Sequence, residues 1–330
     1  MQFLVTGGTG SIGSALVRTL LKEDKAEITI LSRNDSRQHD LKMGLAHDHR
    51  ARCRFVLGDI RDRDTVERAM DGAKTIFHCA AIKHVVGSHS NPGEAASINI
   101  QGTRTVFEAA NREAKHGGII NLIHLSTDKA AGPSNVMGAS KFIAEKIVLE
   151  EQIANDLRRV VVRFGNVWNS SGSVFPTWMT AVKNHRTIYI TDERVTRYVI
   201  TIKRAVETLM KAMGFLTHAP QMFIPEMRQV SLGQIFSRVM RDSGITEYDL
   251  IKTIGLQQGE KLHEALITEE ELKYVSMYNP EVGVLLNFGR KSDPEMQNYF
   301  ASCMTHYLNS ELAFPAHEED FACFQPIINP

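Results

Sequence analysis

The chain has 330 residues, a length that predicts one large domain with an appended lobe, or two domains. Hydrophobic residues make up 43% and charged residues 23%, values that fit neither a disordered chain nor a membrane protein. Lys plus Arg equals Asp plus Glu at 38 each, so no overall field favours nucleic acid or an anionic membrane. Anionic ligands must therefore be bound by local sites.

The cysteines and the apolar runs indicate in which cellular compartment the protein is expected. The chain has four widely spaced cysteines, Cys53, Cys79, Cys303 and Cys323. Because they contain no C-x-x-C pair, we expect reduced thiols. Cys79 is expected to be a core residue. An apolar strand begins at residue 2, so we expect no signal peptide before the fold. No apolar run approaches the ~20 residues that span a bilayer. We therefore expect a cytoplasmic protein.

Apolar runs and amphipathic segments alternate along the first half of the chain. The pattern predicts strands near residues 2–6, 27–31, 53–58, 74–78, 119–126 and 159–164. It predicts helices between them near residues 11–22, 37–48, 62–70, 94–115 and 136–156. Apolar strands joined by helices favour an α/β fold, a Rossmann-type doubly wound parallel sheet, over residues 1–165.

The alternation loosens from Asn166 onward, where Gly, Ser and Pro are frequent. Helical patterns follow at 201–214 and 231–242. We interpret residues 166–330 as a smaller, substrate-binding C-terminal lobe, some segments of which return to the sheet. The tail from Ala313 contains prolines and an acidic triplet and is expected to be irregular and solvated.

A glycine-rich loop joins the first predicted strand to the first helix. Its spacing G-x-x-G-x-x-G places backbone amides at a helix N-terminus, where they can meet a pyrophosphate. The alternative is that the glycines only make a tight turn. The position between strand and helix favours a dinucleotide site that includes Gly7, Thr9, Gly10, Ser11, Ile12 and Gly13.

The ends of the next three strands complete this site. An NAD enzyme usually has an acidic residue after the second strand, whereas this chain has Ser32 and Arg33, which suit the 2′-phosphate of NADP. Arg37 is a second, weaker choice for the phosphate; either arginine could instead be a solvated charge. Further cofactor contacts are expected at the ends of the third and fourth strands, from Asp59, Ile60, Ala80 and Ala81, although Asp59 could equally cap a helix.

Residues 126–141 combine an acid and two lysines just beyond the fifth predicted strand. Ligands bind outside the carboxyl ends of strands in such sheets, so Thr127, Asp128 and Lys129 should face a ligand. Met137 and Lys141 are four residues apart and share one face of the next helix. In isolation, Met137 would be a core residue, and Asp128 and Lys129 a surface pair.

Six motifs together point to a family. They are T-G-G-T-G-S-I-G (6–13), C-A-A-I-K-H-V (79–85), S-T-D-K-A (126–130), N-V-M-G-A-S-K (135–141), R-F-G-N-V (163–167) and G-E-K-L-H-E (259–264). Through these motifs the chain resembles the polysaccharide-biosynthesis branch of extended short-chain dehydrogenases/reductases, and specifically the UDP-N-acetylglucosamine 4,6-dehydratases. The resemblance runs from the first strand to about Ile267.

The resemblance implies a reaction. Tightly held NADP takes a hydride from carbon 4 of the sugar, water is eliminated across carbons 5 and 6, and hydride returns to carbon 6. Asp128 would protonate the departing hydroxyl, Lys129 would remove the carbon 5 proton, and Lys141 would hold the nicotinamide ribose. Most short-chain dehydrogenases have Tyr where this chain has Met137, and a thioether cannot accept the 4-hydroxyl proton. Either Asp128, Thr127 or an ordered water accepts this proton, or oxidation does not occur. The Met favours members that retain configuration at carbon 5.

The resemblance also implies a nucleotide-sugar site. Its expected residues are Lys83 and His84 near the sugar or cofactor, Asn166 and Arg197 near the diphosphate, Ser173 and Val174 near the uracil, and Glu260 of the G-E-K-L-H-E motif. The family usually has Arg-Pro before this motif, whereas this chain has Gln257 and Gln258, so one cationic phosphate contact is missing. We expect no metal, because no carboxylate or thiolate cluster completes a site with His78, His84 and His89.

Three functions stay open. The first is an NADP-dependent UDP-N-acetylhexosamine 4,6-dehydratase in deoxy-aminosugar or nonulosonic acid biosynthesis. The second is a UDP-N-acetylhexosamine epimerase of the same branch, which would not need an acid for a departing hydroxyl. The third is a non-catalytic dinucleotide-binding sensor. The resemblance further implies a homodimer, or a higher homo-oligomer, formed through the helices near 94–115 and 136–156.

Overall fold

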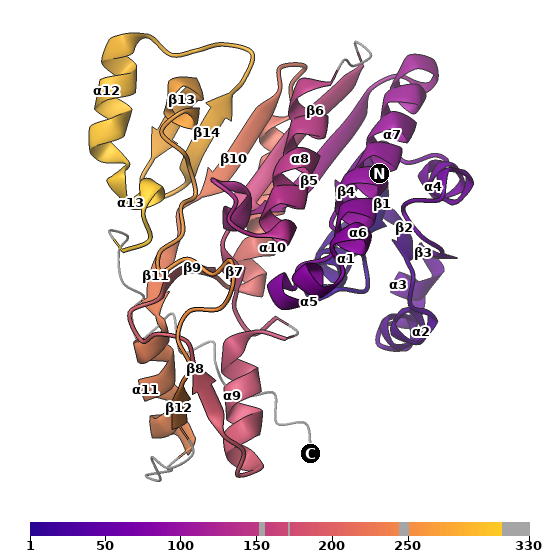
Figure 1. The fold of residues 1–330 in the computed structure, drawn as a ribbon. Coiled ribbons are helices and arrows are strands. Elements are labelled where there is room, and N and C mark those ends of the chain that lie inside the picture. The colour runs from indigo at the N-terminus through magenta and orange to yellow at the C-terminus, as the bar shows by residue number, and fades with distance from the viewer. Residues whose placement is uncertain (152–155, 171, 244–250, 312–330) are drawn as a thin grey trace.

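The fold is built on one large sheet. The computed structural model describes residues 1–151, 156–170, 172–243 and 251–311, so the expectations for the tail lie outside the described residues (Figure 1). In the described part the main sheet has the strand order β13-β14-β10-β6-β5-β4-β1-β2-β3. The strands of the first half are β1 (Gln2–Thr6), β2 (Glu27–Ser32), β3 (Cys53–Leu57), β4 (Thr75–His78), β5 (Ile120–Thr127) and β6 (Leu157–Phe164).

Neighbouring strands from β3 through to β10 run parallel. Every residue of β4 is buried, and seven of the eight residues of β6 are buried, as expected for strands covered on both faces. The expected Rossmann-type doubly wound sheet is therefore confirmed. All carboxyl ends of the parallel strands lie at one edge, where a ligand site belongs.

Helices cover both faces of this sheet. On one face α7 packs beside α4 and α8, and on the other face α1 packs against α10. The helices of the first half are α1 (Ser11–Leu20), α2 (Asp35–Met43), α3 (His47–Ala51), α4 (Arg63–Met70), α5 (Val85–Ser90), α6 (Pro92–Ala96), α7 (Thr103–Gly117) and α8 (Val136–Glu150).

Two predicted helices differ from the structure. The helix expected at 37–48 is divided into α2 and α3, because Gly44 ends α2 and its carbonyl accepts a hydrogen bond of 2.7 Å from Arg18. The helix expected at 94–115 already begins at Pro92, a residue suited to a first helical turn, and passes through a π-helical segment, η1 (Ser97–Gly102), before α7.

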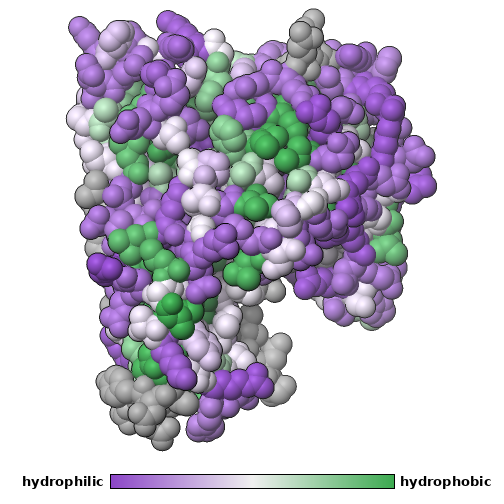
Figure 2. All heavy atoms as spheres, in the orientation of Figure 1, coloured by the Kyte–Doolittle hydropathy of each residue, from purple (hydrophilic) through white to green (hydrophobic). Residues whose placement is uncertain are grey.

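The second half contributes to the main sheet and also forms a lobe. Strands β10 (Gln221–Pro225), β13 (Val275–Asn279) and β14 (Gly283–Asn287) extend the main sheet. The lobe projects from the sheet body (Figures 1 and 2) and has its own apolar core, which includes Trp168, Trp178 and Val230. It contains β7 (Asn166–Val167), β8 (Ile188–Ile190), β9 (Thr196–Ile200), β11 (Arg228–Ser231), β12 (Ile251–Thr253), α9 (Val174–Lys183) and α11 (Leu232–Ser243).

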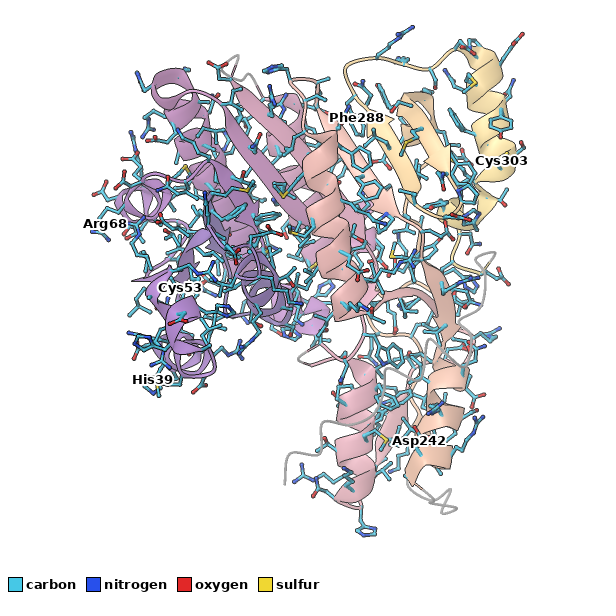
Figure 3. All side chains as sticks on the ribbon, turned by 180° about the vertical axis from the view of Figure 1, so that it is seen from behind. His39, Cys53, Arg68, Asp242, Phe288 and Cys303 are labelled. Carbon is cyan, nitrogen blue, oxygen red and sulfur yellow. The ribbon has the colours of Figure 1, made fainter. Side chains whose placement is uncertain are left out.

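The remaining helices are α10 (Ile202–Ala212), α12 (Pro294–Cys303) and α13 (Thr305–Leu308), with short turns η3 (Met213–Phe215) and η5 (Glu271–Tyr274). The helical patterns expected at 201–214 and 231–242 correspond to α10 with η3 and to α11. Cys53 and Cys303 lie on opposite sides of the molecule (Figure 3), and the described cysteines are free thiols.

A buried arginine joins three parts of the fold. Arg163 on β6 is fully buried and makes paired hydrogen bonds of 2.6 and 3.0 Å to Glu145 of α8. It makes a second pair, of 2.8 and 2.9 Å, to Glu271 of η5, and it donates to the carbonyl of Leu266. Both carboxylates are buried, so removing the guanidinium would leave two unpaired charges away from water.

We predict that Arg163→Leu lowers the free energy of unfolding by about 3–5 kcal/mol, the range for breaking a buried ion pair. The measurement is urea unfolding followed by circular dichroism. The control is Arg194→Leu, which removes an exposed arginine paired with Asp192 and should leave the unfolding midpoint unchanged. Equal midpoints for both variants would contradict the structural role given to Arg163.

Candidate functional site

The loop between β1 and α1 forms a cradle of backbone. Gly7 has a φ of +67°, and a Cβ on it would lie 2.8 Å from the backbone of Ala80 at the end of β4. A Cβ on Gly13 would lie 2.3 Å from the carbonyl oxygen of Gly7. Only glycine fits at either position, and the turn leads directly into the N-terminus of α1, where backbone amides can meet an anion. The cradle therefore suits a phosphate group.

A cavity of about 880 Å³ opens over this cradle and runs along the carboxyl ends of the strands. Five cationic side chains line it, and none of the described lining residues is acidic. Such a cavity attracts anionic ligands although the whole chain carries no net charge. The predicted residues in its lining are Gly7, Thr9, Gly10, Ser11, Ile12, Gly13, Ser32, Arg33, Arg37, Ile60, Ala80, Ala81, Lys83, His84, Thr127, Lys129, Met137, Lys141, Asn166 and Ser173.

Asp59 lies outside this lining. It accepts hydrogen bonds of 3.0 and 2.7 Å from Arg61, and Arg33 is 3.5 Å from the same carboxylate. Burial acts to raise the pKa of Asp59, but the hydrogen bonds and charge of Arg61 outweigh it and lower the pKa. Asp59 therefore stays ionised and holds Arg33 beside the cavity. Arg33 is half exposed, with Glu94 at 3.8 Å on its other side.

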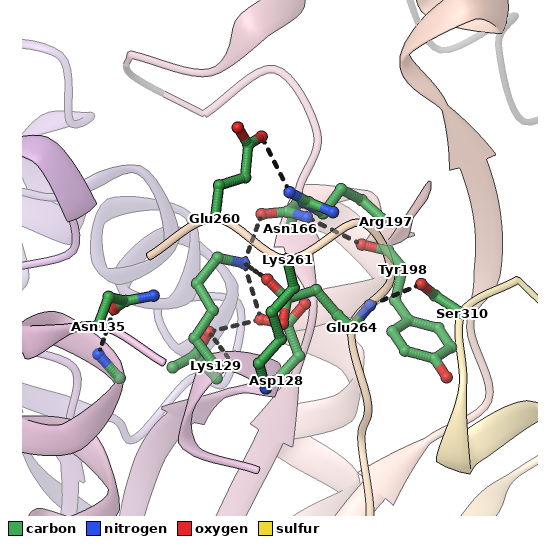
Figure 4. Close-up of polar contacts among 12 residues, drawn as sticks. Asp128, Lys129, Asn135, Asn166, Arg197, Tyr198, Glu260, Lys261, Glu264 and Ser310 are labelled. Carbon is green, nitrogen blue, oxygen red and sulfur yellow. Dashed lines mark hydrogen bonds and ion pairs between the residues drawn. The ribbon is translucent and has the colours of Figure 1, made fainter. Parts of the chain in front are cut away.

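Asp128 and Lys129 follow β5 directly, in a single 3-10 turn, η2 (Asp128–Ala130). Asp128 is completely buried behind Lys129, whose amine lies 3.0 Å from its Oδ1 (Figure 4). The Thr127 hydroxyl donates to the same oxygen at 2.9 Å, and Oδ2 has no hydrogen-bond partner among the described residues. An acid and an amine thus share one small, dry site.

Two further residues contact the Lys129 amine. The Asn166 side-chain oxygen lies 3.3 Å away, and Oε1 of Glu264 lies 3.6 Å away. Glu264 is 4% exposed. The G-E-K-L-H-E motif was identified in the sequence, but the contact of its last residue, Glu264, with Lys129 was not predicted. The two residues are far apart along the chain, and no local pattern indicates that they meet.

Helix α8 brings Met137 and Lys141 to the cavity. Asn135 caps this helix by accepting a hydrogen bond of 2.8 Å from the Gly138 amide. Met137 is buried, and its side chain lines the cavity where the Tyr-x-x-x-Lys pattern would place a hydroxyl. The Lys141 amine donates to the carbonyl of Leu125 at 2.6 Å and lies 3.2 Å from Nε2 of His124.

A buried polar network lies behind Lys141. His124 stacks on His78 with ring centroids 5.1 Å apart, and His78 bonds to the hydroxyls of Thr6 and Thr103. Burial and the Lys141 charge lower the pKa of both imidazoles, so both are neutral. His124 was not predicted, although its two-residue spacing from Ser126 on β5 places both on the face that meets the cavity.

Loops of both halves of the chain also line the cavity. The Lys83 amine is 3.5 Å from the Ser170 hydroxyl, and His84 packs against Gly172. Ser173 lines the cavity, whereas Val174 begins α9 outside the lining. Cys79, expected in the core, is half-buried and lines the cavity, and its burial raises the pKa of the thiol to about 12.

Arg197 and Glu260 are paired with each other outside the lining, at 3.0 Å. Arg197 also donates to the carbonyls of Thr196 and Leu262, so in this structure its charge is directed at protein groups (Figure 4). No three His, Cys, Asp or Glu side chains within the described ranges are grouped as a metal ion requires.

The chain belongs to the polysaccharide biosynthesis protein family, whose model matches residues 3–282. It is 38% identical to an uncharacterized membrane protein of Methanocaldococcus jannaschii, over 82% of this chain and 81% of that protein. It is 34% identical to the capsular polysaccharide biosynthesis protein CapD of Staphylococcus aureus, over 83% of this chain but only 46% of that longer protein. It is 33% identical to a UDP-glucose 4-epimerase of Rickettsia bellii, over 82% of this chain and 78% of that protein.

Solved structures agree with this placement. Pen from Bacillus thuringiensis superposes with a TM-score of 0.84 at 27% identity, over 98% of each chain. A dTDP-glucose 4,6-dehydratase from Streptomyces venezuelae, solved with NAD bound, superposes with a TM-score of 0.69 at 22% identity, over 79% of this chain and 87% of that one. The chain thus shares its fold with this dehydratase, and its relatives of 31–33% identity include several UDP-glucose 4-epimerases.

In the part of the chain that the structure describes, none of the helices combines the length and the apolar character needed to cross a membrane.

We predict that Lys141 loses its proton at an unusually low pH. Burial disfavours the ammonium form and lowers its pKa to about 8, against about 10.4 for an exposed lysine. Lysines labelled by reductive ¹³C-methylation should show one NMR signal that titrates near pH 8 in the cofactor-free protein. The signal should be missing from Lys141→Met; a wild-type spectrum in which no signal titrates below about pH 9.5 would contradict the burial described for this amine.

Proposed function

We propose that this protein catalyses the NADP-dependent dehydration of UDP-N-acetylglucosamine to a UDP-4-keto-6-deoxy-N-acetylhexosamine. The observation that carries the proposal is the Asp128–Lys129 pair: Lys129 lines the cavity together with Met137 and Lys141, and Asp128 is buried directly behind it. Elimination of water needs an acid for the departing hydroxyl and a base for the carbon 5 proton. A simple epimerisation at carbon 4 needs no such acid.

The residues present fit a dinucleotide phosphate. The glycine cradle exposes backbone amides where a Cβ would clash, and Arg33, Arg37 and Lys83 line the adjacent cavity. The acidic residue that would bind an NAD ribose after β2 is replaced by Ser32 and Arg33. When bound, NADP would accept a hydride from carbon 4 of the sugar and return it to carbon 6. Lys141 would hold the nicotinamide ribose.

The protons can be balanced with Asp128 and Lys129 alone. Met137 cannot accept the 4-hydroxyl proton, so ionised Asp128 takes it, through the Oδ2 oxygen that is without a described partner. Asp128 then gives this proton to the departing 6-hydroxyl, which leaves as water. Neutral Lys129 removes the carbon 5 proton, and its ammonium form, whose other hydrogens come from solvent, protonates the same carbon after hydride has reached carbon 6. Protonation by the same amine supports retention of configuration at carbon 5.

The proposal includes a nucleotide-sugar site and a place in metabolism. Lys83, His84, Asn166 and Ser173 line the end of the cavity beyond Lys129, where the sugar diphosphate would lie. For Arg197 to meet the diphosphate, its pairing with Glu260 would have to change. A 4-keto-6-deoxy aminosugar suits deoxy-aminosugar or nonulosonic acid biosynthesis, in keeping with a family defined by polysaccharide biosynthesis.

Self-association through α7 and α8 stays a prediction. The two helices pack against each other, and Ile143 of α8 is 43% exposed. An exposed apolar side chain on a helix pair is compatible with a homodimer face.

A UDP-N-acetylhexosamine epimerase is the second candidate, because several relatives at 31–33% identity are UDP-glucose 4-epimerases. It would share the oxidation at carbon 4 and leave the 6-hydroxyl in place. Asp128 and Lys129 favour the dehydratase.

The first test is incubation of the purified protein with UDP-N-acetylglucosamine in deuterated water, followed by mass spectrometry and proton NMR. We expect loss of water and a 4-keto-6-deoxy product with deuterium at carbon 5, whose couplings distinguish retention from inversion. Lys129→Met should abolish both water loss and exchange. A C4 epimer of unchanged mass would favour the epimerase, and unchanged substrate with bound NADP would contradict both.

The cofactor choice gives a separate prediction. Arg33→Ala should weaken NADPH binding roughly tenfold or more and leave NADH binding unchanged, since a charge-assisted contact to the 2′-phosphate is lost. Fluorescence titration measures both affinities. Arg63→Ala removes an exposed arginine that pairs with Glu67 on α4 and serves as the control. An equal loss of affinity for NADPH and NADH in Arg33→Ala would contradict a contact between Arg33 and the 2′-phosphate.

A further inference from the structure

The Lys129 amine lies between two buried carboxylates that come from distant segments. Asp128 is 3.0 Å from the nitrogen and Glu264 is 3.6 Å from it (Figure 4). Asp128 is fully buried and Glu264 is 4% exposed, so water screens neither interaction well. With all three groups ionised, the cluster carries one net negative charge.

This arrangement conflicts with the use of Lys129 as a base. Two nearby carboxylates favour the ammonium form, and an ammonium ion has no lone pair with which to accept the carbon 5 proton. Asp128 cannot relieve the conflict in the first step of the proposed mechanism, because there it is the ionised group that accepts the 4-hydroxyl proton. A third group must therefore take the proton from Lys129 before carbon 5 is deprotonated.

We propose that Glu264 is this group, a positioning residue that stores the Lys129 proton and so keeps Lys129 neutral while Asp128 is ionised. The inference rests on the proposed dehydratase function. In the transfer, the N–H bond of Lys129 breaks and an O–H bond forms on Oε1 of Glu264, so the net charge of the cluster does not change. After Lys129 has protonated carbon 5, the Glu264 proton can pass back to the amine.

The surroundings of Glu264 suit this role. The Glu264 amide donates a hydrogen bond of 2.9 Å to the Ser310 hydroxyl, and the Glu264 carbonyl accepts one of 2.8 Å from the Ser310 amide. These two hydrogen bonds fix the backbone at Glu264. Removal from water raises the pKa of its carboxyl above the usual range; the charges of Lys129, Arg197 and Lys261 act to lower the pKa, and that of Asp128 acts to raise it. A raised pKa makes the carboxyl a better proton acceptor.

The other charged groups that face Glu264 are already engaged. Arg197 of β9 pairs with Glu260, and the Lys261 amine is bound by the carbonyls of Ala131 and Gly132. Tyr198 is the nearby phenol, but its hydroxyl donates to the carbonyl of His306 and points away from the Asp128–Lys129 pair (Figure 4). Asn166 contacts Lys129 through an amide oxygen, which does not hold a proton.

The test compares Glu264→Gln with Glu226→Gln, which alters another largely buried carboxylate, bound by the Tyr307 hydroxyl away from Lys129. In Glu264→Gln the Lys129 proton can leave only to solvent. We expect kcat at pH 7.5 to fall about 100-fold or more, with KM within roughly threefold of wild type. We also expect the kcat of Glu264→Gln to recover with rising pH, by about tenfold per unit, because the proton must then pass to solvent.

Glu226→Gln should keep the wild-type pH profile whatever its effect on stability. Wild-type kcat and profile for Glu264→Gln would overturn the proposal. A loss of kcat with a wild-type pH profile would also overturn it, because it would show that Glu264 has only a structural role.

A second readout does not depend on turnover. In protein with ¹³C-labelled glutamate carboxyls, we expect one signal that titrates above the usual glutamate range, is missing from Glu264→Gln and shifts in Lys129→Met. If no such signal exists, Glu264 holds no proton and the proposal fails. If the signal is present but UDP-N-acetylglucosamine is not consumed, the result supports Glu264 as the group that holds the Lys129 proton and contradicts the substrate assignment.

Discussion

The Arg163 guanidinium fixes the relative positions of three segments beside the cavity. Its paired hydrogen bonds hold α8, which bears Met137 and Lys141, and η5, which follows the segment that ends in Glu264. Arg163 itself lies on β6, three residues before Asn166. Charges buried this deeply are stable only when each is paired. The site geometry therefore depends on an ion network that never meets the ligand.

The sequence predicted the sheet well because each parallel strand is a short apolar run, buried on both faces, that is separated from the next by a helical pattern. Helix α9 was not predicted, because the alternation loosens from Asn166 onward among frequent Gly, Ser and Pro residues; Pro176 nevertheless lies in the first turn of α9, where proline is tolerated. The split between α2 and α3 was missed because it depends on a contact between Arg18 and Gly44, which sequence periodicity does not contain.

The cofactor side of the site was predictable for the same reason: the glycine loop and the ends of neighbouring parallel strands meet at one edge in any doubly wound sheet. The substrate side was not. Arg197 and Glu260 were each expected to contact the ligand, yet they pair with each other. Glu264 was passed over because only the folded chain shows that it lies against Lys129. Local pattern identifies residues on regular elements, whereas contacts between loops depend on tertiary packing.

In the proposed reaction, Asp128 and Lys129 eliminate water while hydride passes from carbon 4 to carbon 6 of one sugar. The most direct measurement uses UDP-N-acetylglucosamine with deuterium at carbon 4, in ordinary water. The account predicts a product that has lost water and carries the deuterium at carbon 6. Deuterium that remains at carbon 4 of a product with unchanged mass would contradict it.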